Sequence, residues 1–255
     1  MELDGATPRL TRGRRVGMLL SFGATPMGAT ITLIGNEGFH VAAGGAGVFI
    51  DAFCDAVPAL PPGLAERRAE LILVTHSHWD HFGADAVAAA AERTGASVLG
   101  PPGVCRALRK RLPAERMVAM DPAPAPRGQL AVAATAVVRS AKVSAFRTRH
   151  SHDHNSYLVE MGGLRFFHDG DNEETRCLDP AALRPLDALF IGPWQGSGWA
   201  QFVEAVAPRR WFLMHLSDEE LAEHEAGVFL TETCGCRRVP ADLVVLHPGE
   251  SMELP

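Results

Sequence analysis

The chain has 255 residues, of which 47% are hydrophobic, and a formal net charge of −6 at pH 7. This apolar content is ample for a buried core, in one large domain or in two small ones. The acidic balance and the lack of a long basic run argue against nucleic-acid binding through a surface that tracks phosphates.

The N-terminal segment precedes any predicted strand or helix. Three arginines stand before a short apolar run at 16–22, a pattern that faintly resembles a signal peptide with paired arginines. Because the run is short and no small-residue cleavage site follows it, we expect either a disordered leader over 1–17 or a start codon placed upstream of Met18 or Met27. Residues 18–255 are predicted to form a single domain.

The first half of the chain reads as short strands followed by alternating strands and helices. Strands are predicted at 30–34, 39–43 and 48–51, separated by glycine-containing turns typical of an antiparallel meander. Beyond a proline-rich break, predicted strands at 71–75 and 97–100 alternate with predicted helices at 64–69, 84–93 and 104–112. The basic side chains of the last helix are expected to form a solvated face rather than a phosphate-binding patch.

The second half repeats this order after a proline-containing stretch, which we interpret as the join between two halves of one domain. Strands are predicted at 129–138, 143–148, 156–160, 164–168, 188–191, 211–214 and 244–246, with helices near 199–206 and at 218–226. Strands first, then strands alternating with helices, in each half: this order predicts an α/β protein with two mixed sheets packed face to face and helices outside.

Cysteine usage and hydropathy indicate the compartment. The five cysteines, at positions 54, 105, 177, 234 and 236, are scattered and odd in number. This predicts reduced thiols in a cytoplasmic protein rather than a disulfide framework. Cys234 and Cys236 lack a second Cys/His pair nearby, so ordinary turn residues are favoured over a redox or metal pair. No apolar stretch reaches the roughly 20 residues that cross a bilayer, so no stable membrane insertion is expected.

One loop concentrates metal-ligating side chains directly after the apolar run 71–74. His76, His78, Asp80 and His81 place three imidazoles and a carboxylate within six positions. These are the ligand types of zinc and its first-row neighbours in catalytic sites. The loop also lies at the carboxyl end of a predicted strand, where α/β folds place their sites. We therefore predict a metal site in this loop, in preference to a histidine-rich surface loop.

A site for two metals needs more ligands than one loop supplies, and three places beside apolar runs offer them. They are the stretch 150–154, with histidines at 150, 152 and 154; the stretch 168–171, with His168, Asp169 and Asp171; and His215. The remaining histidines, at 40, 224 and 247, are expected to be structural or solvated because they fall within a hairpin strand, a helix and a turn.

These motifs together resemble the metallo-β-lactamase-fold superfamily of metal-dependent hydrolases, from about residue 30 to the C-terminus. The segments 32–39, 48–51 and 164–171 are most similar to the branch that contains ascorbate-6-phosphate lactonase and the N-acyl-phosphatidylethanolamine phospholipase D type enzymes. The resemblance implies a four-layer αββα sandwich. The chain departs from this branch at Asn36, where a histidine is common, and in lacking a Pro-Gly-His turn before the third ligand.

The resemblance also implies a ligand set for two divalent ions. His76, His78 and His152 would hold the first ion; Asp80, His81 and His215 would hold the second; Asp171 would bridge the two. His152 is chosen over His150 and His154 because a His-Asp pair commonly stands there in the branch. Zn²⁺ is the expected metal, and Mn²⁺ or Fe also suits His/Asp ligands. Asp51 and Asp153 are candidates for orienting the ligand rings.

Such a site would use a metal-bridging hydroxide to attack a small ester, lactone or phosphodiester, with Asp80 orienting it or accepting its proton. An anionic substrate is compatible with the acidic chain because metal ions supply local positive charge. Trp79, Trp194 and Trp199 could line a pocket for an apolar or ring-shaped group, or pack in the core.

Alternative functions are a nuclease or lipid phosphodiesterase, an iron-dependent oxidoreductase on the same scaffold, and a metal-stabilised binding protein. The nuclease is disfavoured by the acidic charge, the oxidoreductase by the absence of an added flavin or thiol-handling domain, and the binding protein by the complete ligand set. A small-molecule partner is expected, and a homo-oligomer is compatible with the sequence.

Overall fold

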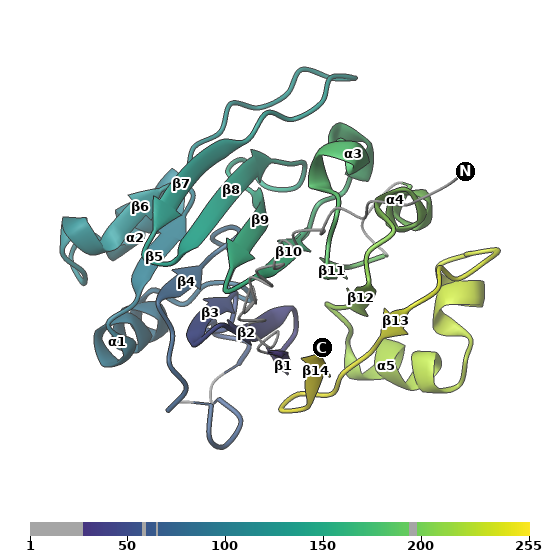
Figure 1. Cartoon of the computed structure of the whole chain (residues 1–255), viewed down its shortest axis with the longest axis horizontal. Coiled ribbons are helices and arrows are strands. Elements are labelled where there is room, and N and C mark those ends of the chain that lie inside the picture. The colour runs from purple at the N-terminus through teal and green to yellow at the C-terminus, as the bar shows by residue number, and fades with distance from the viewer. Residues whose placement is uncertain (1–27, 58–59, 65, 194–197) are drawn as a thin grey trace, which may run out of the picture.

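The computed structural model describes residues 28–57, 60–64, 66–193 and 198–255, and these form two seven-stranded sheets with helices outside them (Figure 1). This confirms the predicted α/β class and the four-layer arrangement. The leader predicted for 1–17 and the tryptophan at position 194 lie outside the described residues. Within the described ranges, no helix is long and apolar enough to cross a membrane.

The first sheet has the strand order β14-β1-β2-β3-β4-β5-β6. Its strands are β1 (Ala29–Gly35), β2 (Gly38–Ala43), β3 (Ala46–Ile50), β4 (Leu71–Leu73), β5 (Ser97–Gly100), β6 (Met117–Ala119) and β14 (Ser251–Leu254). Strands β1 to β3 form the expected antiparallel meander, and β3 to β6 are parallel. Every residue of β3, β4 and β5 is buried, as expected for parallel strands covered on both faces.

The second sheet has the order β13-β12-β11-β10-β9-β8-β7. Its strands are β7 (Ala134–Val138), β8 (Ala141–Arg147), β9 (Asn155–Met161), β10 (Leu164–His168), β11 (Ala188–Ile191), β12 (Arg210–Leu213) and β13 (Leu243–Val244). Strands β7 to β10 are antiparallel, whereas β10 to β13 are parallel. The loops that carry His76, Asp171 and His215 follow the carboxyl ends of β4, β10 and β12, respectively.

Three apolar clusters hold the layers together. The core between the sheets includes Phe39, Phe190 and Phe212, with ring centroids 4.5 Å apart for the first pair and 4.9 Å for the last two. Helices α1 (Ala84–Thr94) and α2 (Pro102–Leu108) pack on the outer face of the first sheet. On the second sheet, α3 (Pro180–Leu183) and α4 (Trp199–Val206) pack in the same way, and α5 (Asp218–Glu225) follows β12.

The structure differs from the predicted elements in a few places. The helix predicted at 64–69 does not form in the described part of that segment. The strand predicted at 129–138 begins only at Ala134. Short strands β6 and β14 and helix α3 were not predicted. Short 3₁₀ helices at Ala114–Arg116 and Thr175–Cys177, and a π-helical turn at Phe229–Thr233, complete the described structure.

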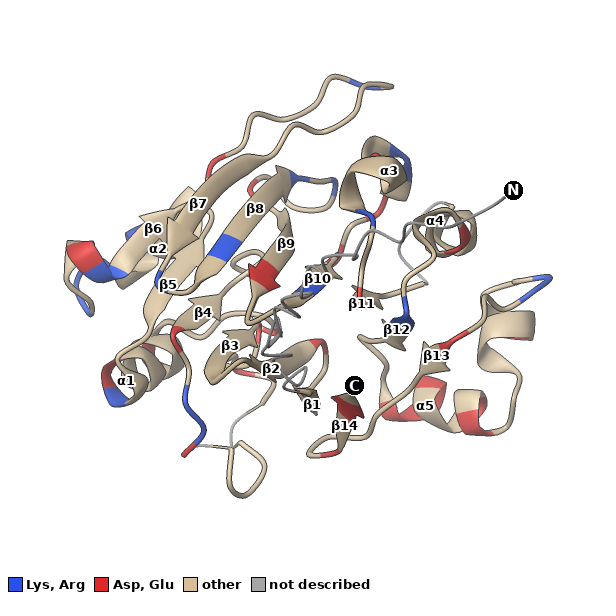
Figure 2. Cartoon of the chain, in the orientation of Figure 1, with Lys and Arg blue, Asp and Glu red and all other residues tan. Residues whose placement is uncertain are grey.

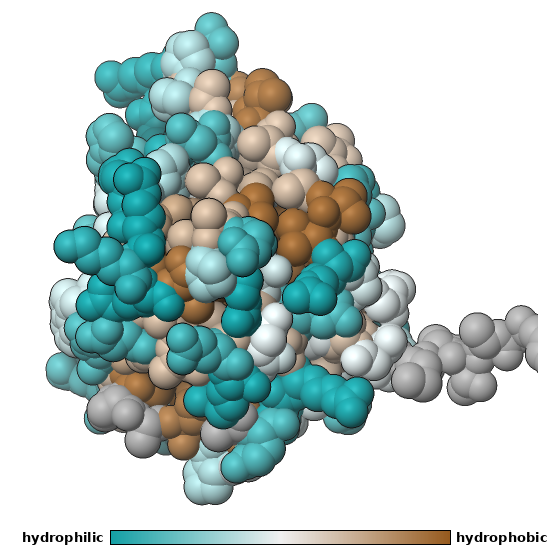
Figure 3. All heavy atoms as spheres, turned by 90° about the vertical axis from the view of Figure 1, so that its left-hand side faces the viewer, coloured by the Kyte–Doolittle hydropathy of each residue, from teal (hydrophilic) through white to brown (hydrophobic). Residues whose placement is uncertain are grey.

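The surface bears out the absence of a long basic run. Lys and Arg are scattered over the ribbon, and α5 carries acidic residues along its length (Figure 2). On the side where both sheets end, at β6 and β7, hydrophobic side chains lie among hydrophilic ones (Figure 3). Val137 on β7 is 74% exposed there.

Candidate metal centre

The histidine-rich loop runs from the end of β4 to the start of α1 and is anchored to the neighbouring strand. The backbone N–H of Thr75 donates to Asp51 Oδ1 at 2.8 Å, and its hydroxyl donates to Asp51 Oδ2 at 2.5 Å. Farther along, the carbonyl of His78 accepts hydrogen bonds from the N–H groups of His81 and Phe82 at 3.1 and 2.8 Å. This turn places the loop's histidines over the edge of the first sheet.

The first half-site consists of His76, His78, His150 and Asp171, whose potential ligand atoms lie within 4.8 Å of one another. His150 Nε2 is 3.2 Å from His78 Nδ1 and 3.3 Å from Asp171 Oδ2. The ring of His76 lies 4.4 Å from that of His78 and 4.9 Å from that of His150, between centroids. Three imidazoles and one carboxylate therefore converge on one position.

The second half-site brings together Asp80, His81, His215 and the same Asp171. His81 Nε2 is 3.3 Å from Asp171 Oδ2 and 3.5 Å from Asp80 Oδ2. His215 Nε2 is 3.5 Å from Asp171 Oδ1 and 3.6 Å from Asp80 Oδ2. The Asp171 carboxylate therefore lies within reach of both groups of side chains.

These residues fit a pair of cations. Among the described residues, His76 Nε2, His81 Nε2 and Asp171 Oδ1 are buried and make no hydrogen bond. Buried polar atoms without partners are costly, so such atoms facing one another indicate a missing ligand. Burial lowers the pKa of His76 to about 3, so its ring is neutral at pH 7, the form that binds metal.

Hydrogen bonding also selects the tautomer of His76. The hydroxyl of Thr75 uses its proton on Asp51 and lies 3.0 Å from His76 Nδ1. It therefore accepts the Nδ1–H of His76, which leaves the Nε2 lone pair directed at the first half-site. Asp51, predicted from sequence to orient a ligand ring, acts here through the threonine hydroxyl.

Behind His81 lies a buried carboxylate that sequence analysis missed. Glu37 is 0% exposed, and its Oε1 is 2.7 Å from His81 Nδ1, while Asp51 Oδ2 is 3.4 Å from the same nitrogen. Burial opposes the charged form of His81, but the surrounding carboxylates, Glu37 first, hold its pKa well above the ordinary value. Glu37 stands in a glycine-flanked turn, and only its acidic side chain beside an apolar strand offered a sequence signal.

The stretch 150–154 requires a correction. His150 joins the first half-site, whereas His152, chosen from the resemblance, is exposed and contributes no atom to either group. The reason is the turn before β9, which directs His152 outward while Arg147 Nη1 donates to its carbonyl at 3.0 Å. His154 is buried, and its Nε2 accepts the backbone N–H of Asp171 at 2.9 Å. It thereby positions the Asp171 backbone.

Other candidates have structural contacts. His168 is buried and its Nε2 donates to the carbonyl of Glu37 at 3.0 Å. Asp153 accepts the N–H of Gly103 at 3.1 Å, away from the ligand rings. Trp79, which stands between His78 and Asp80 in the loop, is 65% exposed.

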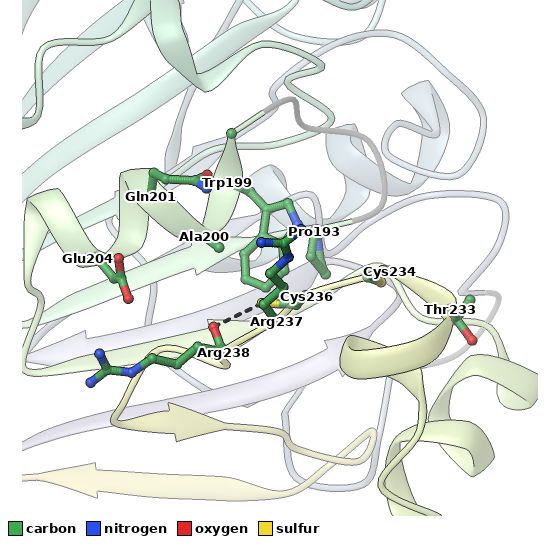
Figure 4. Close-up of a pocket in the computed structure, with 12 residues that line it drawn as sticks. Pro193, Trp199, Ala200, Gln201, Glu204, Thr233, Cys234, Cys236, Arg237 and Arg238 are labelled. Carbon is green, nitrogen blue, oxygen red and sulfur yellow. Dashed lines mark hydrogen bonds between the residues drawn. The ribbon is translucent and has the colours of Figure 1, made fainter.

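A separate hollow of about 660 Å³ lies between α4 and the segment after the π-helical turn (Figure 4). Trp199 is buried against Trp211, with ring centroids 5.8 Å apart, so it packs in the core. Cys236 Sγ lies 3.0 Å from the carbonyl of Arg238, as expected for a turn residue. All five cysteines are free. None of the residues that line this hollow belongs to either half-site.

Comparisons with known proteins agree with this architecture. The family model of the beta-lactamase superfamily domain matches residues 47–225. A UPF0173 metal-dependent hydrolase of Thermococcus onnurineus (strain NA1) is 27% identical over 235 residues, which cover 88% of this chain and 99% of that protein. It is not named for the lactonase or phospholipase D branch, so that finer resemblance stays a prediction.

Two solved structures share the fold. Igni18, a metallo hydrolase from Ignicoccus hospitalis KIN4/I, aligns with a TM-score of 0.63 and 17% identity over 89% of this chain and 99% of its own. CmlA, a diiron β-hydroxylase from Streptomyces venezuelae, aligns with a TM-score of 0.62 and 14% identity over 90% of this chain and 55% of its own. With a family match over most of its length and the fold of these structures, the chain belongs to the beta-lactamase superfamily domain family.

Proposed function

We propose that this protein, a metal-dependent hydrolase, binds two divalent ions and hydrolyses a small ester, lactone or phosphodiester. The observation that carries the proposal is Asp171, whose carboxylate lies 3.3 Å from both His150 Nε2 and His81 Nε2. A carboxylate within reach of two imidazole groups is suited to bridging two cations. The name of the Thermococcus relative supports the hydrolase class.

The ligand set that we propose follows the two half-sites. His76, His78 and His150 would hold one ion, Asp80, His81 and His215 the other, and Asp171 both. His150 takes the place that the sequence resemblance gave to His152. Divalent ions held by these residues would supply polarisation of the scissile group and a water molecule whose pKa is lowered toward about 7.

The remaining chemistry falls to side chains. Asp80 Oδ2 lies between His81 Nε2 and His215 Nε2, at 3.5 and 3.6 Å, and its side chain is 24% exposed. It can therefore face both the second half-site and the solvent, where it would accept the proton of the attacking water. The Nδ1–H of His76, held by Thr75, keeps that ring aligned during turnover.

The test is a panel of chromogenic esters, lactones and phosphodiesters offered to the metal-loaded protein. We expect turnover of at least one class, its loss after chelation, and its recovery on metal return. Hydrolysis should disappear in His81→Ala, which removes a proposed ligand. A metal-replete protein that cleaves none of the three classes would contradict the proposal. Iron as the only bound metal would instead favour the oxidoreductase alternative.

A further inference from the structure

The turn between β1 and β2 is built into the second half-site. Gly38 approaches β3 so closely that an added Cβ would lie 2.8 Å from the carbonyl oxygen of Asp51. Asn36 Nδ2 donates to the carbonyl of Asp80 at 3.2 Å, and the Asn36 carbonyl accepts the N–H of His215 at 3.2 Å. One four-residue turn therefore contacts both loops that supply the second half-site, and it carries Glu37 inward.

The side chain of Glu37 makes one short polar contact, to His81, and its carboxylate also lies within 4.8 Å of potential ligand atoms of Asp171 and His215. Its Oε1 lies 2.7 Å from His81 Nδ1, and within the described part of the chain neither oxygen receives a hydrogen bond from any other side chain or from the backbone. Asp51, the other carboxylate near that nitrogen, is already engaged by the N–H and hydroxyl of Thr75. Asp51 thus accepts the hydrogen bonds of Thr75, and Glu37 is the closer of the two carboxylates to His81 Nδ1.

A fully buried carboxylate with one partner is expensive to keep unless a nearby cation offsets its charge. The other nitrogen of His81 faces Asp171 at 3.3 Å, on the side of the proposed ion. An acceptor on Nδ1–H fixes the ring and its tautomer, directs the Nε2 lone pair at the ion, and makes the imidazole a stronger ligand. Glu37 is suited to this role by distance, burial and lack of competing donors.

We propose that Glu37 is the positioning residue of the second half-site: its carboxylate holds His81 by Nδ1–H and raises the affinity of that half-site for its ion. This inference rests on the proposed two-ion function. It predicts an asymmetric defect, because Glu37 has no contact with His76, His78 or His150. Outer carboxylates of this kind are typically worth 10- to 100-fold in metal affinity.

The test is a chelator-competition titration with Zn²⁺ on the full chain, comparing wild type, Glu37→Gln and the matched control Asp153→Asn. Glutamine keeps the size of the side chain and removes its charge. We expect one of the two dissociation constants to rise about 10- to 100-fold in Glu37→Gln and the other to stay unchanged. Asp153→Asn, which removes the charge of a carboxylate outside both half-sites, should bind both ions as wild type does.

Three results would overturn the inference. They are two unchanged constants in Glu37→Gln, equal weakening of both ions, and complete loss of one ion, which would make Glu37 a ligand itself. Should Glu37→Gln fail to fold without metal, Glu37→Asp keeps the charge but shortens its reach, and it should show a smaller one-ion defect. Wild-type protein that binds no Zn²⁺ would overturn the proposed function, so the two failures are distinguishable.

Discussion

The two half-sites share Asp171 but are supported differently. Behind His76 stands the neutral hydroxyl of Thr75, which donates a hydrogen bond to Asp51 and accepts one from His76 Nδ1. Behind His81 stand two carboxylates, those of Glu37 and Asp51, within 2.7 and 3.4 Å of its Nδ1. Behind His150 stands Glu173, 2.9 Å from its Nδ1, but that carboxylate is 56% exposed, whereas the two behind His81 are buried. Equal ligand numbers therefore do not imply equal affinity.

The largest expected effect comes from removing the shared bridge. In Asp171→Ala both half-sites lose a carboxylate oxygen, so we expect less than one ion per chain. Hydrolysis should fall by on the order of 10³-fold, since the ions supply several kcal/mol of transition-state stabilisation. Elemental analysis measures the number of bound ions, a kinetic assay measures the rate of hydrolysis, and circular dichroism checks that the variant is folded. Retention of two ions would show that the half-sites are independent.

Stepwise chelation should reveal the asymmetry directly. We expect the ion at His76, His78 and His150 to leave first, because His78 is exposed. The carboxylate behind His150, that of Glu173, is also 56% exposed, whereas Glu37 behind His81 is buried. Removing both ions should lower the melting temperature by about 10 °C, given that tight binding contributes about 4 kcal/mol at ion concentrations near 1,000 times the dissociation constant. Simultaneous release at one chelator concentration would contradict the comparison.

A matched pair of variants tests which histidine belongs to the first half-site. His150→Ala removes a proposed ligand and should lower the affinity for one ion at least 10-fold. Loss of a residue that only contacts a ligand already costs 10- to 100-fold, so loss of the ligand itself should cost no less. His152→Ala removes the exposed neighbour and should leave metal affinity and rate within about twofold of wild type. Isothermal titration calorimetry of both variants with Zn²⁺ measures these affinities. The reverse pattern would restore the assignment made from the resemblance.

The smallest effect is expected outside the ligand set, at Trp79. Its side chain is 65% exposed in the loop that carries His78 and Asp80, so Trp79→Ala should change the free energy of unfolding by less than about 0.5 kcal/mol. We expect a raised KM for substrates with an apolar ring and little change for small anionic ones. Kinetics with paired substrates that differ only in such a ring measure this. Equal effects on both substrates would remove Trp79 from the binding surface.

Sequence predicted the parts of this architecture that are local and missed those that depend on turns. The apolar run before His76 and the strand Leu164–His168 before Asp171 identified two strand ends. These strands lie in different sheets, so His76 and Asp171 converge because the two sheets pack face to face, and not because the strands pair. Periodicity does not reveal which of three alternating histidines a turn directs inward, so the choice of His152 over His150 rested on the resemblance alone. Glu37 was missed because a glycine-flanked acid is typical of a solvent-exposed turn.

The departure at Asn36 now has a structural context. Its side chain and carbonyl hold the loops of Asp80 and His215 together, and its φ of 51° lies in the left-handed region that asparagine tolerates. The residue that follows, Glu37, then points into the interior. The sequence difference therefore lies at the turn that supplies the second half-site with its buried charge.

The central claim is that one chain binds two metal ions through a shared carboxylate. Elemental mass spectrometry on protein purified without added metal tests it most directly. The account predicts about two equivalents of one divalent metal per chain, falling below one in Asp171→Ala. Near-zero metal in the wild-type protein that reconstitution cannot restore would contradict it.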